Sequence, residues 1–249
     1  MDAGIRAKWN YTSQEASNRN ELFQLFKKCP IPENEFLMNM PLFFIRQDLS
    51  HTIFMNELYK KIINTHGIVM EFGVRWGRNL CLFESFRGMY EPFNHNRKII
   101  GFDTFEGATS IDKKDKKKMA EGDYSVPEDY EKYLAQILDC HEKESPISHI
   151  KKYQMIKGKA EIEITNNLRT NPDTIVALAF FDFGIYIPTK KCLEAIKGHL
   201  TKGSIVAFDH LNSHDETGET IAFREVFGID TYMIERNPLS PLQSYVVIK

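Results

Sequence analysis

With 249 residues, of which 42% are hydrophobic, the chain is long enough to bury a sizeable core as one α/β domain with an N-terminal extension. The formal net charge is −2, so no excess of basic residues points to a nucleic-acid partner. No apolar run approaches the roughly 20 residues that span a bilayer, and the polar N-terminus lacks a signal-peptide pattern. We therefore expect a cytoplasmic protein that does not bind nucleic acid or membranes.

The four cysteines lie far apart in the sequence, at Cys29, Cys81, Cys140 and Cys192. No Cys-x-x-Cys pair is present, which argues against a zinc knuckle and a thioredoxin-like site. We expect buried, reduced thiols.

Residues 1–65 are predicted to form an N-terminal helical extension. Residues 14–26 are expected to be a short helix, which the Cys-Pro-Ile-Pro stretch at 29–32 ends. Apolar residues recur at helical spacing over 48–64, with Ser50 as the expected N-cap. These helices carry more apolar surface than the domain core requires, which predicts a homo-oligomer, a dimer.

From residue 66 to 249, strand and helix patterns alternate. Buried strands are predicted at 67–73, 98–103, 153–158, 174–182 and 204–209, and a closing strand pair at 231–235 and 244–248. Helices are predicted at 76–89, 128–138, 190–200 and 217–227. This alternation is typical of a Rossmann-like α/β fold with a mostly parallel, seven-stranded sheet and helices on both faces. Residues 105–150 form an insertion expected to cover the substrate.

Four acidic residues stand where an apolar strand ends: Glu71, Asp103, Asp182 and Asp209. In an open α/β sheet, ligands bind outside the carboxyl ends of the strands. We therefore expect these four side chains to converge on one crevice.

The first strand-to-helix connection has the character of a cofactor site. Gly73 permits a tight turn and Gly77 lets the helix start approach a ligand, but the spacing is not the Gly-x-Gly-x-x-Gly of dinucleotide sites. Asp103 can accept hydrogen bonds from ribose hydroxyls, and Gly158 opens the loop beside which an adenine would lie. An acidic crevice suits the cationic S-adenosylmethionine (SAM) better than a pyrophosphate.

Six segments together resemble the macrocin- and mycinamicin-type sugar O-methyltransferases, a class I SAM-dependent family. They are Glu-Phe-Gly-Val-Arg-Trp-Gly at 71–77, Gly-Phe-Asp-Thr-Phe-Glu-Gly at 101–107, Gly-Asp-Tyr-Ser at 122–125, Gly-Lys-Ala-Glu at 158–161, Phe-Asp-Phe-Gly-Ile-Tyr-Ile-Pro-Thr at 181–189 and Gly-Ser-Ile-Val-Ala-Phe-Asp at 203–209. They follow the order of the family and cover roughly residues 65–248. The resemblance implies the class I methyltransferase fold.

The resemblance also implies the roles of particular residues. SAM would be bound by residues of the first motifs together with two later positions, namely Glu71, Gly73, Gly77, Asp103, Thr104, Gly158 and Asp182. A divalent cation, commonly Mg²⁺, would be held after the fourth and fifth strands, here by Asp182, Asp209 and His210. Such an ion would lower the pKa of a substrate hydroxyl.

The chain departs from the family at two positions of this second site. Gly184 replaces the second acid of an Asp-x-Asp pattern, and His210 replaces the second acid of an Asp-Asp pattern. Imidazole favours Mn²⁺, iron or zinc over Mg²⁺. With the usual acid missing, Asp182 and His210 are the candidate catalytic residues, and His210 can take a proton from a hydroxyl.

The leading interpretation is a SAM-dependent O-methyltransferase that acts on a sugar, a nucleotide sugar, a phosphorylated metabolite or another small hydroxylated molecule. The lysine-rich run at 113–118 could attract an anionic substrate. Three alternatives remain. They are a SAM-binding regulator that has lost its base, an NAD(P)-dependent oxidoreductase, and a nucleic-acid methyltransferase, which the lack of an Asn/Asp-Pro-Pro-Tyr motif disfavours.

Overall fold

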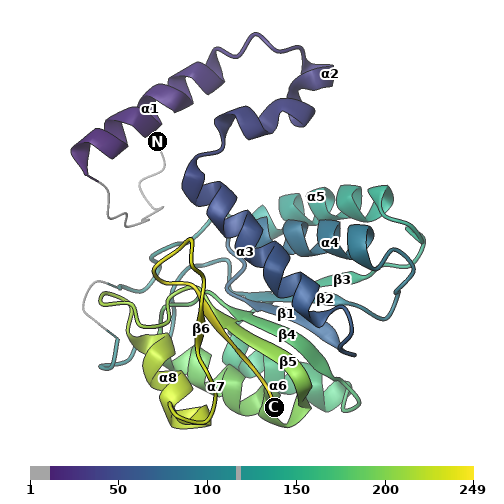
Figure 1. Ribbon diagram of the computed structural model, residues 1–249, viewed down its shortest axis with the longest axis vertical. Helices are drawn as coiled ribbons and strands as arrows, with labels where there is room; N and C mark the ends of the chain where they lie inside the picture. Colours follow the sequence, from purple (N-terminus) through teal and green to yellow (C-terminus); the bar gives the residue numbers. More distant parts are fainter. Residues whose placement is uncertain (1–11, 116–118) are drawn as a thin grey trace.

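The structure, a computed structural model, describes residues 12–115 and 119–249, so Lys116–Lys118 of the lysine run lie outside it. Seven strands form one sheet in the order β3-β2-β1-β4-β5-β7-β6 (Figure 1). Their bounds are β1 Ile68–Phe72, β2 Ile99–Asp103, β3 Tyr153–Lys157, β4 Val176–Phe181, β5 Leu200–Phe208, β6 Glu235–Arg236 and β7 Ser244–Val247. The first five strands pair in parallel, and β7 and β6 close the sheet antiparallel. The predicted Rossmann-like fold is confirmed.

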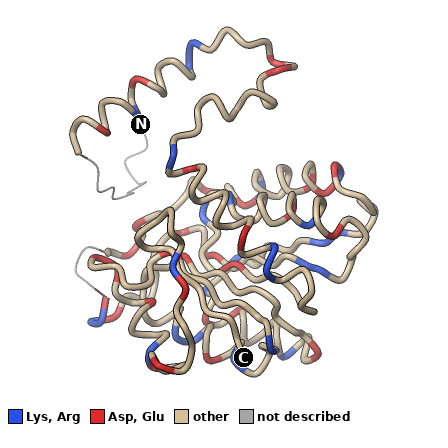
Figure 2. The backbone as a smooth tube through the Cα atoms, in the orientation of Figure 1, with Lys and Arg blue, Asp and Glu red and all other residues tan. Residues whose placement is uncertain are grey.

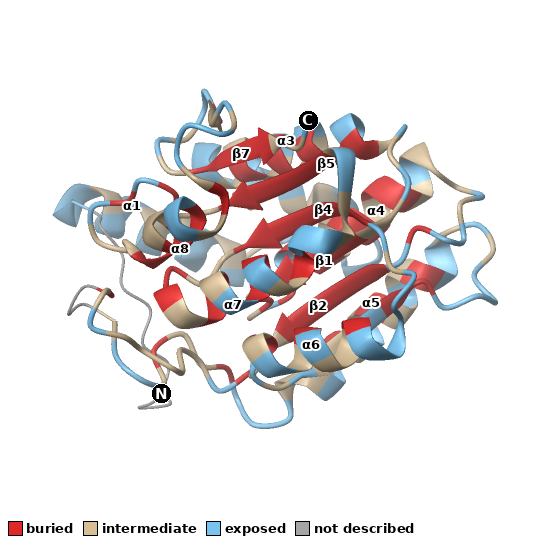
Figure 3. Ribbon diagram, turned by 90° about the horizontal axis from the view of Figure 1, so that it is seen from below, coloured by how far each residue is buried: buried red, intermediate tan, exposed pale blue. Residues whose placement is uncertain are grey.

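Helices cover both faces of this sheet. One face carries α3 Arg46–Ile62, α4 Arg78–Tyr90 and α5 Tyr130–Glu144. The other face carries α6 Ala160–Thr170, α7 Tyr186–Ile196, the 3₁₀ turn η2 Lys197–His199 and α8 Gly218–Phe227. The central strands are almost wholly buried between the two layers (Figure 3). Such strands read as continuous apolar runs, and this is why they were visible in the sequence.

Helix α3 belongs to the core although it precedes the first strand. It buries Phe54, Met55, Leu58, Tyr59 and Ile62 in the same hydrophobic cluster as the sheet. The part that stands apart is the preceding segment, with α1 Ser13–Lys27, α2 Glu33–Phe36 and the 3₁₀ helix η1 Leu37–Phe43 (Figure 1). None of these three elements has a buried residue. Their apolar side chains pack mainly on each other, as Phe26 does on Phe36 and Phe43.

Several local predictions were wrong. Ser50 is not an N-cap, because α3 begins one turn earlier at Arg46, where the Asp48 carboxylate accepts the Ile45 amide hydrogen at 3.2 Å. Helix α6 was missed, since it is short and buries only one residue per turn. The strand expected at 231–235 is reduced to Glu235–Arg236, which pairs with the start of β7.

Charged residues of both signs are interspersed over the described chain (Figure 2). Within the lysine-rich run, the Lys114 ammonium group donates hydrogen bonds to the Glu225 carboxylate at 2.5 Å and to the Tyr186 hydroxyl oxygen at 2.7 Å. No helix in the described ranges combines the length and apolar character needed to cross a membrane. The four cysteines are free thiols as expected, although only Cys192 is fully buried.

Candidate active site

A cavity of about 470 Å³ opens at the carboxyl ends of β1, β2, β4 and β5. This volume lies within the range of roughly 300–1,000 Å³ that is usual for small-molecule sites. Six of the predicted site residues line it: Gly73, Asp103, Thr104, Asp182, Asp209 and His210. Three others, Glu71, Gly77 and Gly158, are not on its wall.

The turn at residues 73–77, called here the cofactor turn, joins β1 to α4 at the edge of the cavity. Gly73 has a φ of +96°, and a Cβ atom at this position would lie 2.4 Å from the Asp182 carbonyl oxygen. A side chain there would collide with rigid backbone, so glycine is required by both space and conformation. The ends of β1 and β4 therefore approach closely where the strand order reverses, which is the usual ligand position in such sheets.

Asp103 orders the cofactor turn from the neighbouring strand. Its Oδ2 accepts the amide hydrogens of Val74 and Arg75 at 2.7 and 2.8 Å, and its Oδ1 accepts that of Phe105 at 2.6 Å. Burial raises the pKa of Asp103, and the three amide hydrogen bonds oppose that shift. A carboxylate has about four lone-pair sites, so three fixed contacts leave about one for a ligand hydroxyl.

Arg75 is a cavity residue that the sequence analysis did not single out. Its guanidinium lies 4.9 Å from the ring centre of Tyr124 and 5.5 Å from that of Trp76, and it lines the cavity. Its Nε atom is buried without a hydrogen-bond partner. Two aromatic rings thus hold a cation at the cavity wall with donor capacity unused.

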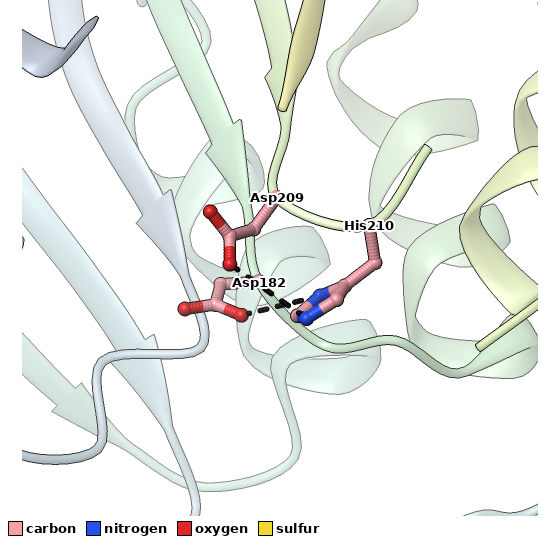
Figure 4. A group of neighbouring side chains, drawn as sticks. All are labelled: Asp182, Asp209 and His210. Carbon is pink, nitrogen blue, oxygen red and sulfur yellow. Dashed lines mark ion pairs between the residues drawn. The ribbon is translucent and has the colours of Figure 1, made fainter. Parts of the chain in front are cut away.

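Asp182, Asp209 and His210 form the chemical centre of the cavity (Figure 4). The His210 Nδ1 atom lies 3.5 Å from Asp182 Oδ1, and the Nε2 atom lies 3.7 Å from Asp209 Oδ2. A third carboxylate, that of Glu216, accepts from His210 Nε2 at 2.9 Å. Glu216 also lies against the position that Gly184 leaves open, because a Cβ atom at Gly184 would be 3.4 Å from the Glu216 side chain.

Glu219 holds the two loops that carry this centre. Its side chain is fully buried. Its Oε1 accepts the amide hydrogens of Phe183 and Gly184 at 3.0 and 2.9 Å, and its Oε2 accepts that of His210 at 3.0 Å. One carboxylate therefore fastens the loop after β4 to the loop after β5. The sequence offers no signal for this role, because Glu219 reads as an ordinary acid in the first turn of α8.

The crowding of acids in this buried centre raises the pKa of both Asp182 and His210. Burial, helped by the Asp209 charge, raises the pKa of Asp182 to about 8. Burial acts to lower the pKa of His210, but the hydrogen bond to Glu216 and the charges of Asp209 and Asp182 raise it well above its usual value. Without a ligand, the centre therefore retains protons at neutral pH.

Because Asp182 and His210 retain protons in the folded state, we expect the ligand-free protein to lose stability as pH rises from 6 to 8.5. Asp182 has a folded pKa of about 8 against about 3.9 in unfolded chains. The fold therefore holds an extra proton between these values, and stability falls as pH rises through that window. The raised pKa of His210 acts in the same direction, since its contribution is complete below about 6.5 and is lost as pH rises through the folded pKa.

Asp182 is about a third exposed, so solvent reduces the effect, and we expect a loss of about 1 kcal/mol, or roughly 2–4 °C in melting temperature. Thermal unfolding at the two pH values measures it. Asp182→Asn should show a smaller decrease than the wild type. Equal pH dependence in the two proteins would contradict the assignment.

The same three residues can offer a divalent cation one ligand atom each, and these atoms all lie within 4.8 Å of one another. Two carboxylates and one imidazole suit Mn²⁺ better than Mg²⁺, which favours oxygen ligands only. The donor set therefore fits a divalent metal, with the preference that the sequence indicated.

Searches of protein-family models and of curated proteins found no match. Among solved structures, the chain is similar to the calicheamicin methyltransferase CalS11, with 37% identity over 99% of both chains and a TM-score of 0.93. A second CalS11 structure, described as TDP-rhamnose 3′-O-methyltransferase, has 37% identity over 96% of both chains and a TM-score of 0.85. The O-methyltransferase NovP, at 15% identity over 80% of both chains and a TM-score of 0.58, shares the fold.

Proposed function

This chain belongs to the SAM-dependent sugar O-methyltransferases of the macrocin and mycinamicin type, and we propose that it methylates a hydroxyl of a nucleotide-linked deoxysugar. The observation that carries the proposal is the near-complete overlap with CalS11, whose described acceptor is TDP-rhamnose. The cavity supports it, because acids and a cation share one wall there. Such a mixture can bind a cationic cofactor and an anionic nucleotide sugar together.

We propose that the cofactor turn and Asp103 hold SAM. Asp103 would accept from the ribose, and Gly73 and Thr104 would let the ligand approach the backbone. Glu71, Gly77 and Gly158 would act from behind the wall by shaping the turn and the neighbouring loop. Bound SAM supplies a methyl group on a positively charged sulfur, which the acidic wall attracts.

The Asp182–His210 pair is the proposed proton acceptor. In the metal-free protein the two side chains lie 3.5 Å apart, so their titrations are coupled, and once the centre has released a proton the pair can take the proton of an acceptor hydroxyl as the oxygen attacks the methyl carbon. With Mn²⁺ or Mg²⁺ bound, Asp182, Asp209 and His210 would instead serve as its ligands, and the ion would lower the pKa of that hydroxyl in place of the pair. Holding the two reactants in line provides much of the acceleration.

Arg75 is expected to bind the carboxylate of the methionine part of the cofactor. Arg75→Ala should weaken S-adenosylhomocysteine (SAH) binding by about 10–100-fold, the value of a charge-assisted hydrogen bond. Methylthioadenosine, which lacks the amino-acid group, should bind both proteins equally in calorimetric titrations. If SAH affinity is unchanged and only the KM of the acceptor rises, Arg75 serves the acceptor phosphates and this prediction is wrong.

The function itself is tested by incubating the EDTA-treated protein with SAM and TDP-rhamnose, with and without Mn²⁺ or Mg²⁺. We expect mass spectrometry to show a singly methylated nucleotide sugar, at a higher rate with Mn²⁺. Free rhamnose and a phosphorylated sugar serve as comparison acceptors. Transfer to a non-sugar acceptor alone, or to none, would overturn the proposed acceptor class.

We also propose that the chain forms a homodimer through its N-terminal segment. Phe23, Leu37, Met38 and Leu42 are each more than half exposed on elements that bury nothing. A soluble monomer rarely leaves so much contiguous apolar surface uncovered. Light scattering should give the mass of two chains, and Leu42→Glu should shift it toward one. A monomeric wild type would contradict the proposal.

A further inference from the structure

A buried chain of polar side chains runs behind the active site and joins its two halves. It begins at Asp209 on the cavity wall, whose Oδ1 lies 2.7 Å from Gln243 Nε2. Gln243 Nε2 lies 2.7 Å from His51 Nδ1, and His51 Nε2 lies 2.6 Å from Asn79 Oδ1. Asn79 Nδ2 lies 3.0 Å from Glu71 Oε1. Only the two acids at the ends, Glu71 and Asp209, were predicted from the sequence; the three residues between them were not.

The direction of every hydrogen bond in this chain can be assigned. An ionised Asp209 only accepts, so the Gln243 atom beside it is the amide nitrogen, which donates to both Asp209 and His51 Nδ1. Since Nδ1 accepts, the His51 proton is on Nε2 and is donated to Asn79 Oδ1. The Asn79 amide nitrogen then donates to Glu71. Asn237 fixes the same orientation of Gln243 by donating to its Oε1 at 2.8 Å.

The connecting side chains are as inaccessible as core residues. His51, Asn79 and Gln243 are 6%, 5% and 5% exposed. Buried polar groups are costly unless they are satisfied, and a satisfied network fixes the positions of its members. The middle residue comes from α3, which lies outside the strand-and-helix repeat that forms the cavity.

The two ends of this row of hydrogen-bonded side chains reach different parts of the site, the cofactor turn and the Asp209 carboxylate. At one end, Asn79 in the first turn of α4 and Glu71 near the end of β1 bracket the cofactor turn. At the other end, Gln243 holds the carboxylate of Asp209 beside His210. His51 joins the two arms, because it hydrogen-bonds to Asn79 on one side and to Gln243 on the other.

We propose that His51 is a positioning residue of the methyltransferase site, which fixes the cofactor turn through Asn79 and the acceptor-side carboxylate of Asp209 through Gln243. This assignment rests on the proposed function for its acceptor-side half. His51 does not touch the cofactor or the acceptor. It acts through Gln243 on Asp209, and through Asn79 on Glu71 and the start of α4. Residues that contact ligating groups directly typically contribute about 10–100-fold to affinity or activity, and His51, which is one contact further away, should lie at the lower end of that range.

The test compares four variants by three measurements, namely SAH affinity, Mn²⁺ affinity and kcat. His51→Leu should weaken SAH binding and also lower kcat, each by about tenfold or more. Asn79→Leu should mainly weaken SAH binding, and Gln243→Leu should mainly lower kcat and the affinity for Mn²⁺. His51→Gln, which can accept from Gln243 and donate to Asn79, should restore much of both. SAH and Mn²⁺ titrations need no acceptor, so they remain informative if the proposed acceptor class fails.

Leu58→Ala is the matched control for a purely structural effect. Leu58 is fully buried on the same face of α3, in the hydrophobic cluster, and its aliphatic side chain forms no hydrogen bond. It should lower the melting temperature while leaving SAH affinity and kcat of the folded protein near wild type. The proposal is overturned if His51→Leu behaves like this control, or if His51→Gln is no better than His51→Leu.

Discussion

Asp182→Asn should lower kcat for methyl transfer by about 10²–10⁴-fold while the protein still folds and binds SAH, because a positioned proton acceptor contributes about that much. Asn has the same shape as Asp, so β4 and the Glu219 contacts of the following loop can remain in place. The amide cannot accept a proton as a carboxylate does, and the substitution removes one carboxylate of the metal site.

Steady-state rates with saturating SAM and acceptor, together with SAH and Mn²⁺ titrations, measure the effect of Asp182→Asn. Glu161→Gln is a matched control, because it removes a carboxylate from another part of the cavity wall, where Ser110 donates to it. We expect it to leave kcat within a few-fold of wild type. A wild-type rate in Asp182→Asn would mean that the proton leaves through another group.

The parts of the site that were predictable are those attached to the ends of buried strands. Asp103, Asp182 and Asp209 each follow an apolar run, and the carboxyl ends of parallel strands must meet at one edge of the sheet. Gly73 was visible for a related reason, since a turn that approaches the next strand has no room for a side chain. Periodicity and strand topology were sufficient for these residues, and for the order of most elements.

The parts that were missed depend on contacts between distant segments. Gln243 meets His51 across a separation of 192 residues, and Glu219 reaches Gly184 across 35. Neither residue has a local pattern that differs from an ordinary polar residue at a strand or helix start. Arg75 was quoted within a motif, but its role depends on the rings of Trp76 and Tyr124, and Tyr124 arrives from the insertion. Such roles are fixed by tertiary packing, which composition and periodicity do not encode.

Replacing Glu219 should give the largest loss of stability among single substitutions at the site. Two effects oppose each other in Glu219→Leu. Burial raises the pKa of Glu219 to about 7, so removing this acid relieves a desolvation cost. It also leaves three amide hydrogens, those of Phe183, Gly184 and His210, without an acceptor. A buried donor left unpaired costs about 1–3 kcal/mol, which applies in full to the Gly184 amide and in part to the half-buried amides of Phe183 and His210, so the loss outweighs the relief and we expect a net destabilisation of about 3 kcal/mol.

That destabilisation corresponds to a melting temperature lower by roughly 6–12 °C, and activity should fall as well, because the loops that carry Asp182 and His210 are no longer fastened together. Glu219→Gln should lie between Leu and wild type, since its oxygen can replace Oε1 while its NH₂ group faces the His210 amide. Glu225→Gln on the same helix weakens the part-exposed contacts of Glu225 with Lys114, Lys190 and the Tyr186 hydroxyl, and should cost less than about 1 kcal/mol. Urea unfolding of the four proteins gives the order. If Glu219→Leu were as stable as Glu225→Gln, the two loops must be held by other contacts, and the site would not depend on this carboxylate.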